Sequence, residues 1–188
     1  MKNKIKIFTL ILNLILFFSL NAFGNEQFNF DITEIEITNK GNNFKGFKRG
    51  TITTNDGVAI NADEFNYDKS LNILKAKGSV KIIDKINSYI IYTDNVTYLK
   101  NQEKIFTEGT SKGTYDDIII KAQKFNYDKK LNIIIAEKNV EFDDTQQDIK
   151  IFSNKIINKK NLEEVYSKGF TEAIIEKKYN FSSIDVLL

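Results

Sequence analysis

The sequence predicts an all-β protein built from repeated pairs of strands. Residues 65–73 read FNYDKSLNI and residues 125–133 read FNYDKKLNI, so eight of nine residues agree at a distance of sixty. Apolar and polar residues alternate in both segments, as they do in strands that are buried on one face. No stretch after residue 24 shows sustained helical periodicity. These three observations together favour an array of β-repeats.

The repeat is longer than these nine residues. Segments 62–84 and 122–144 are identical at 12 of 23 positions without a gap. Two weaker copies, 93–109 and 153–169, place apolar residues at the same positions of the unit, which we call stations. Residues 35–50 are a candidate for an eroded first unit. The unit is therefore about thirty residues. One unit cannot bury its apolar face alone, so neighbouring units must share an interior.

Each unit is expected to hold two strands and a turn. Residues 58–62 alternate, and so do residues 65–67, but the phase slips between them, which indicates a bulge or corner near Asp63-Glu64. Asp68-Lys69-Ser70 is typical of a tight turn. A second alternating strand follows over residues 74–82.

The same pattern continues to the end of the chain. KKNLEEVY, residues 159–166, has helical propensity, but its alignment with the other copies predicts a turn and a strand. Residues 183–188 align with residues 122–127, so the sequence stops inside a fifth unit. We expect an N-terminal part of a longer protein; the alternative is a complete chain whose last strand is an unpaired edge.

One station recurs with glycine, where strands bend or backbones approach closely. The third copy has Lys138 there, so glycine is not obligatory. The repeat glycines are Gly78, Gly109 and Gly169.

Residues 1–24 are predicted to be a cleaved signal peptide, which leaves one domain over residues 25–188. Lys2, Lys4 and Lys6 precede an apolar run of fourteen residues, and Ala22-Phe23-Gly24 offers a cleavage site. The alternative is an uncleaved N-terminal anchor. Either way the domain is expected outside the cytoplasm.

The composition argues against several classes of function. Without the three lysines of the signal, 24 basic residues face 25 acidic ones, a net charge of −1 that does not suit a nucleic-acid partner. The chain has neither Cys nor His, so the commonest metal ligands and nucleophiles are missing. The pairs Asp116-Asp117 and Asp143-Asp144 are expected at turns. We therefore expect no enzyme, no catalytic residues, no metal and no cofactor.

The repeat resembles the organic-solvent-tolerance (OstA-like) family, which comprises LptA, LptC and the N-terminal domain of the lipopolysaccharide-assembly protein LptD. Its unit is an A-D-x-apolar-x-Y strand and turn, followed by a strand ending in A-x-G-x-V. In the third unit Gln123 and Lys138 depart from this pattern. The best matches are Ala62, Asp63, Phe65, Tyr67, Ala76, Gly78 and Val80 in one unit, and Ala122, Phe125, Tyr127, Ala136 and Val140 in the other.

The resemblance implies a twisted, partly open β-jellyroll in the periplasm. Its apolar interior would hold the acyl chains of lipopolysaccharide, and similar OstA-like domains would join it edge to edge by strand addition, the first strand near residues 28–37 being one candidate edge. The opening residues 31–57 and the truncated end favour the LptD branch, with an outer-membrane barrel and a lipoprotein as partners at the cell outer membrane. The alternatives are a stand-alone LptA-like bridge protein and, outside the family, a structural or adhesive β-solenoid.

The resemblance also implies a lipid-binding face on the inward side of the strands. In a closed sandwich the same residues would be ordinary core. The expected inward residues are Val58, Ile60, Phe65, Tyr67, Leu74, Ile82, Ile91, Val96, Tyr98, Ile105, Ile118, Ile120, Phe125, Tyr127, Ile134 and Val140.

Overall fold

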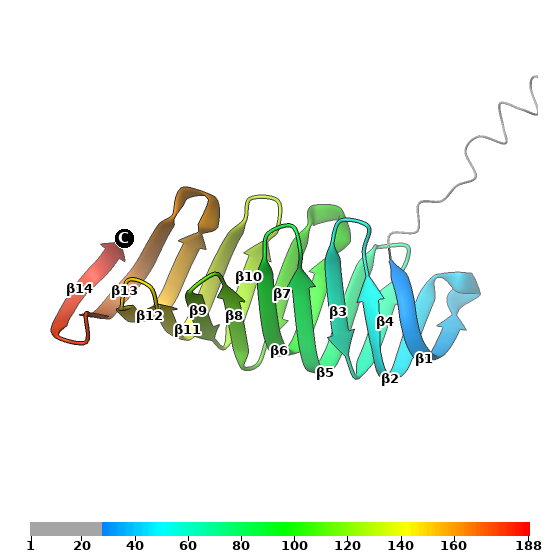
Figure 1. Ribbon diagram of the computed structural model, residues 1–188. Coiled ribbons are helices and arrows are strands. Elements are labelled where there is room, and N and C mark those ends of the chain that lie inside the picture. The colour runs from blue at the N-terminus through cyan, green and yellow to red at the C-terminus, as the bar shows by residue number, and fades with distance from the viewer. Residues whose placement is uncertain (1–27) are drawn as a thin grey trace, which may run out of the picture.

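The structure, a computed structural model, describes residues 28–188 and is all-β (Figure 1). Apart from strands, this part of the chain holds only three single turns of 3₁₀-helix, at Asn39–Gly41, Lys100–Gln102 and Lys160–Leu162, and none of its helices could span a membrane. The strands are β1 (Asn29–Thr38), β2 (Asn43–Thr53), β3 (Val58–Ala62), β4 (Glu64–Asp68), β5 (Ile73–Asp84), β6 (Tyr89–Leu99), β7 (Lys104–Glu108), β8 (Ser111–Tyr115), β9 (Ile118–Ala122), β10 (Lys124–Asp128), β11 (Ile133–Asp144), β12 (Ile149–Lys159), β13 (Glu164–Ile175) and β14 (Tyr179–Leu187).

All strands belong to one antiparallel meander that runs from β1 to β14 (Figure 1). Four long strands each pair with two consecutive short ones: β2 and β5 pair with β3 and β4, β6 pairs with β7 and β8, and β11 pairs with β9 and β10. The breaks between the short strands align with register shifts in the long strands, as between Lys77 and Val80. The meander therefore folds along a line of corners, and its two halves enclose a single core.

Folding the meander creates two rows of turns, which we call lips. The lysine-rich lip consists of turns 39–42, 69–72, 100–103, 129–132 and 160–163, and contains six lysines and two glutamates. The acidic lip consists of turns 54–57, 85–88, 116–117, 145–148 and 176–178, and contains five acidic residues and three lysines. Opposite net charge on the two lips favours their approach.

The burial pattern confirms the thirty-residue unit. The aromatic or apolar residue that opens each unit is buried in all four copies. The two stations that follow it are buried as well, which means that one interior runs through the repeats. These stations are Phe65, Val96, Phe125 and Ile156; then Tyr67, Tyr98, Tyr127 and Asn158; then Leu74, Ile105, Ile134 and Val165.

The predicted inward residues lie in this core with one difference. Fifteen of the sixteen are buried, whereas Ile118 is only half-buried, because it borders a cavity at the C-terminal end. The corner predicted at Asp63-Glu64 is confirmed, since β3 ends at Ala62 and β4 begins at Glu64. The segment 159–166 forms a 3₁₀ turn and a strand, as predicted. The predicted signal peptide lies outside the described residues.

One prediction about the acidic pairs was wrong. Asp116 and Asp117 form a turn, but Asp143 and Asp144 are the last two residues of β11. Asp144 is buried because its carboxylate accepts hydrogen bonds from the backbone N–H groups of Gln146 and Gln147, at 3.0 and 2.9 Å. It caps the turn from inside the strand.

The lysine-rich lip is held together by side chains of its own turns. Asp68 accepts the backbone N–H of Leu71 at 3.0 Å, as the predicted turn requires. The amide of Asn72 donates to that of Asn101 at 2.6 Å, which links two successive turns. Sixty residues later the same bond joins Asn132 to Asn161 at 2.7 Å.

The glycine station is a corner with left-handed backbone. Gly78, Gly109 and Gly169 have φ of 80°, 97° and 84°, and Lys138 adopts 68° at the same station. A Cβ on Gly78 would lie 2.5 Å from an Asp63 carboxylate oxygen, whereas a Cβ on Gly169 would meet nothing within 4 Å. Every unit therefore needs a left-handed backbone at this station, but only some units need a residue without a Cβ atom there.

We predict that Gly169→Ala lowers the free energy of unfolding by about 1 kcal/mol, the backbone contribution alone. Gly78→Ala adds the clash with Asp63, and we expect a loss of about 2–3 kcal/mol. Urea titration followed by circular dichroism would measure both. Equal losses for the two variants would contradict the assigned role of Asp63, and Lys138→Gly should be neutral or stabilising.

Candidate functional site

The apolar interior is the first part of the candidate site, and its N-terminal end is filled by aromatic rings. Phe28 packs edge-on against Tyr67 at a centroid distance of 4.8 Å and against Tyr98 at 6.0 Å. Phe30 and Phe44 stack at 5.5 Å beside them. Such contacts exclude water from this end of the core.

The predicted inward residues of both sheet halves form one contiguous cluster. The structure thus brings together the residues that the sequence assigned to a lipid-binding face. Their burial alone is also what an ordinary core requires. Any lipid must reach them past the two lips, so the seam between the lips is the second part of the site.

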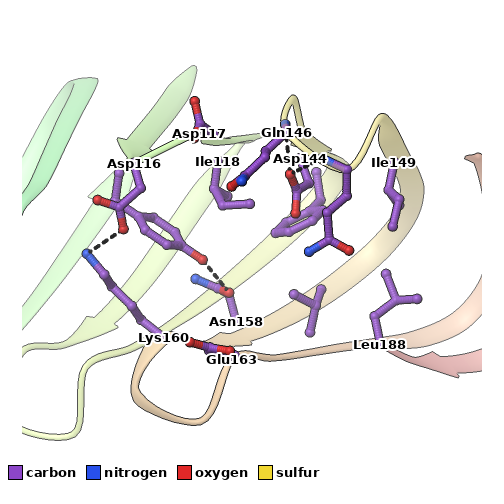
Figure 2. A pocket seen from close by; sticks show the side chains of 14 residues that line it. Asp116, Asp117, Ile118, Asp144, Gln146, Ile149, Asn158, Lys160, Glu163 and Leu188 are labelled. Carbon is purple, nitrogen blue, oxygen red and sulfur yellow. Dashed lines mark hydrogen bonds and ion pairs between the residues drawn. The ribbon is translucent and has the colours of Figure 1, made fainter. Parts of the chain in front are cut away.

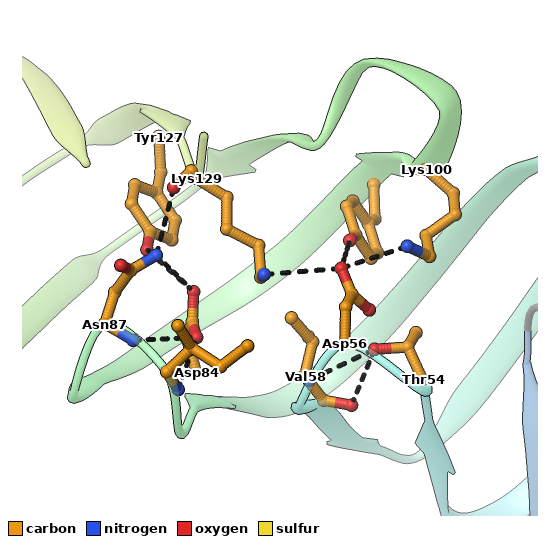
Figure 3. A network of polar contacts seen from close by, with 10 residues as sticks. Thr54, Asp56, Val58, Asp84, Asn87, Lys100, Tyr127 and Lys129 are labelled. Carbon is orange, nitrogen blue, oxygen red and sulfur yellow. Dashed lines mark hydrogen bonds and ion pairs between the residues drawn. The ribbon is translucent and has the colours of Figure 1, made fainter. Parts of the chain in front are cut away.

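Asp56, on the first turn of the acidic lip, forms one closure of the seam (Figure 3). Its carboxylate, on the acidic lip, lies 3.0 Å from the ammonium of Lys100 and 3.3 Å from that of Lys129, both on the lysine-rich lip. The hydroxyl of Tyr98 donates to it at 3.4 Å. Burial raises the pKa of Asp56, but hydrogen bonds from Thr54 and Lys100 and the charges of Lys100 and Lys129 outweigh it and hold the pKa far below its usual value.

A second closure centres on Tyr127 (Figure 3). Its hydroxyl donates to the Asp84 carboxylate at 2.7 Å and accepts from the amide of Asn87 at 2.8 Å. Asn87 also donates to the backbone carbonyl of Lys129 at 3.0 Å, across the seam. Burial, with the Asp84 charge, raises the pKa of Tyr127 far above its usual value, so the hydroxyl stays a donor.

Lys160 makes the third closure. Its ammonium donates to the Asn87 carbonyl at 3.0 Å and lies 3.4 Å from the Asp116 carboxylate. It also lies 4.6 Å from the centroid of the Tyr115 ring, within the range of a cation–π contact. Tyr115 in turn donates to Asn158 at 2.9 Å, and burial raises its pKa to about 12.

Beyond Lys160 the lips part around a cavity of about 580 Å³ (Figure 2). Apolar residues of both sheet halves form its floor, and charged residues of both lips form its rim. Figure 2 shows Ile118, Ile149 and Leu188 on its walls and the Asp116–Lys160 ion pair at one side.

Sequence reasoning missed the seam, although a signal for it exists. Asp56 and Asp116 are sixty residues apart, as are Lys100 and Lys160, so the same ion pair recurs in the repeat. Charged residues in turns carry no periodic hydrophobic signal. Only the pairing of turns across the seam, more than forty residues apart in sequence, identifies them as partners.

The free edges of the sheet are the third part of the site. Within residues 28–188, β1 and β14 each have one neighbouring strand, so one side of each has backbone groups that no described strand pairs. The sequence predicted a first edge strand near residues 28–37, and the bounds of β1 differ from that range by one residue at each end. Both edges expose apolar side chains, among them Ile35 and Ile37 on β1 and Phe181, Ile184 and Leu187 on β14.

Comparisons with known proteins identify the fold. The chain is similar to the crystal structure of LptH from Pseudomonas aeruginosa, described as the LptA-homologous periplasmic component of the lipopolysaccharide transport device. The match has a TM-score of 0.54 at 14% identity and covers 61% of this chain and 85% of LptH. No protein-family model and no curated protein sequence matches the chain. The likeness shows that the fold is the β-jellyroll of LptA-like proteins.

We predict that Asp56→Asn lowers the free energy of unfolding at pH 7 by about 1–3 kcal/mol, because it leaves the buried ammonium of Lys129 without its anion. The pKa of Asp56 is lowered in the folded state, so its contribution is complete above about pH 4, the unfolded pKa, and is lost as the pH falls below it. The gap between wild type and variant should therefore shrink in acid.

Thermal unfolding from pH 7 to pH 3 would measure this gap. Asp63→Asn is the matched control, because the Arg49–Asp63 pair is half exposed and should change stability by less than about 1 kcal/mol. A gap that is the same at all pH values would contradict the assigned charge on Asp56.

Proposed function

We propose that this chain is a periplasmic lipopolysaccharide-transport domain that shields acyl chains in its β-jellyroll interior and performs no bond chemistry. The observation that supports it is one contiguous apolar interior on a fold shared with LptH. An enzyme would need a cluster of reactive groups in that interior. The buried hydroxyl groups among the described residues, such as those of Thr107 with Ser111 and of Thr171 with Ser167, hydrogen-bond to one another.

The energetics favour transient binding. Sequestering an acyl chain of a dozen methylenes gains on the order of 10 kcal/mol before ordering is subtracted. A chain that entered the core would also displace tightly packed rings such as Tyr98 and Tyr127. The net gain is therefore smaller, which suits a protein that must release its cargo.

Access to the interior has two routes on this geometry. The lips can part, which exchanges three polar closures for contacts with water and with the lipid head group. Alternatively the acyl chain enters through the cavity at the C-terminal end, where the lips are already apart. Neither route requires the sheet hydrogen bonds to break.

The finer assignment follows the resemblance of the repeat. We propose a signal peptide over residues 1–24, a domain over residues 25–188, and the N-terminal domain of an LptD-like protein that delivers lipopolysaccharide to an outer-membrane barrel with its lipoprotein. A stand-alone LptA-like bridge is the alternative within this function. A structural β-solenoid is the alternative outside it, and the filled N-terminal half of the core favours that reading.

Docking by strand addition fits the two free edges. A partner jellyroll would extend the meander past β1 or β14, satisfy backbone groups there and cover the exposed apolar side chains of these strands. The interiors of the two domains would then be continuous.

Photocrosslinking separates transport from a structural role. A photoreactive phenylalanine analogue at position 98, inside β6, should yield adducts with lipopolysaccharide, and so should positions 67 and 134. Position 92 on the outer face of the same strand is the matched control, because Tyr92 is 44% exposed. Adducts at 92 and none at 98, 67 or 134 would support the solenoid.

Cysteine crosslinking tests the docking, and the absence of native Cys makes it unambiguous. Ile35→Cys on β1 and Ile184→Cys on β14, in separate molecules, should form mixed disulfide dimers, because head-to-tail addition brings these edges together. Leu71→Cys, exposed on a turn, is the control and should not join either one. Like-with-like dimers would indicate a two-fold contact instead.

A further inference from the structure

The lysine-rich lip carries leucines at the tips of its turns. Three of its five turns have leucine as their third residue, and Leu71, Leu131 and Leu162 are 61%, 59% and 63% exposed. The other two turns hold Gly41 and Gln102 at that place, so the turn forms without an apolar residue there. A single exposed leucine is ordinary on a protein surface. One that returns at the same place in three turns indicates a contact with something outside the domain.

The conformation of each tip is fixed by the backbone and not by the leucine. The carboxylate of Asp68 accepts the N–H of Leu71 at 3.0 Å, and that of Asp128 accepts the N–H of Leu131 at the same distance. Each of these two leucines is followed by a buried asparagine with a left-handed backbone, φ being 56° and 59°. The leucine side chain therefore lies in solvent on a turn that is already ordered, which lowers the cost of any contact it makes.

Exposed lysines accompany these tips. Lys40, Lys69 and Lys130 are exposed, and none of the three forms an ion pair within residues 28–188. The other three lysines of the lip are the ones that close the seam against acidic residues. Glu163 is the one exposed acidic residue in the described turns of this lip. The outer side of the lip is therefore cationic, whereas the charge of its inner side is neutralised by the acidic lip.

The three leucines lie along one row. Successive turns of the lip are two strands apart, and neighbouring strands lie about 4.8 Å from each other. Leu131 and Leu162 are therefore about 10 Å apart, and Leu71 lies about 20 Å from Leu131. Such separate points do not form the contiguous core of an interface with a folded protein. They suit a fluid surface, into which each tip can insert on its own.

We propose that the lysine-rich lip docks on the surface of an anionic phospholipid bilayer. Leu71, Leu131 and Leu162 would insert between the lipid head groups, and Lys69 and Lys130 would lie at the level of the lipid phosphates. The acidic lip would be repelled by the same surface, so the charge decides which lip meets the lipid. This docking needs no cargo in the interior, and the inference therefore does not depend on the proposed function.

Tryptophan reporters test the place of contact, because the chain has no Trp of its own. With vesicles of phosphatidylcholine and phosphatidylglycerol, the emission of Leu71→Trp and of Leu131→Trp should shift to shorter wavelength and be quenched by brominated acyl chains. Ile86→Trp is the matched control, because Ile86 is 67% exposed on a turn of the acidic lip, and its emission should not change. Equal shifts at all three positions would overturn the assigned surface. Unshifted emission at 71 and 131 in a protein that sediments with the vesicles would do the same.

Sedimentation with the same vesicles measures the affinity. Replacing the three leucines by Asn should weaken binding at least about tenfold. Lys69→Gln combined with Lys130→Gln should weaken it at least about fivefold and flatten its dependence on salt. Ile86→Asn is the control and should leave the affinity unchanged. All variants share one N-terminus, so a contribution of residues 1–24 cancels in these ratios, and circular dichroism confirms that each variant is folded.

Further outcomes would contradict the proposal. Equal affinity for vesicles of phosphatidylcholine alone would overturn the selection of anionic lipid, and a protein that sediments with neither kind of vesicle at low salt would overturn the docking itself. If the emission of Leu131→Trp shifts with rising protein concentration in the absence of vesicles, as dimers form in light scattering, a second copy of the chain covers the lip and the proposal fails. Lipopolysaccharide adducts at position 98 without any vesicle binding would remove this inference and leave the proposed function standing.

Discussion

The constraint on which this structure depends is that an antiparallel meander has one apolar face and must cover it with itself. Among the described residues, each half of the folded sheet packs only against the other half of the same sheet. The fold line therefore has to pass through every long strand, and the left-handed station at Gly78 and Lys138 provides the bend. The two lips and the seam between them follow from that bend.

A folded meander leaves a seam between its two rows of turns. Polar side chains close this seam, whereas apolar side chains fill the core. Asp56, Tyr127 and Lys160 form bridges between turns, which are the most easily moved parts of a sheet. These bridges are largely buried, so opening the seam costs their pairing, as between Asp56 and Lys129, but it leaves the hydrogen bonds of the sheet in place. A jellyroll closed in this way can open along its seam without losing its strands.

Period and alternation predicted the strands, the corners and the inward face, because those features repeat with the sequence. They could not predict the seam, whose partners lie in turns and meet only after the meander folds. Asp143-Asp144 was assigned to a turn from residue type alone, but the strand extends through both because Asp144 caps the turn from within. Ile118 was expected to be core like Val58, but it is half-buried and lines a cavity together with residues thirty and more positions away, which a pattern within one unit cannot indicate.

The copies of the unit also differ from one another, and the differences lie in single stations. The stations of Tyr89 and Tyr98 hold Ile149 and Asn158 sixty residues later, and both replacements line a cavity, whereas Tyr67 and Tyr98 pack against the ring of Phe28. The shared pattern of the units builds the interior. The departures from that pattern change the size and polarity of the side chains along it.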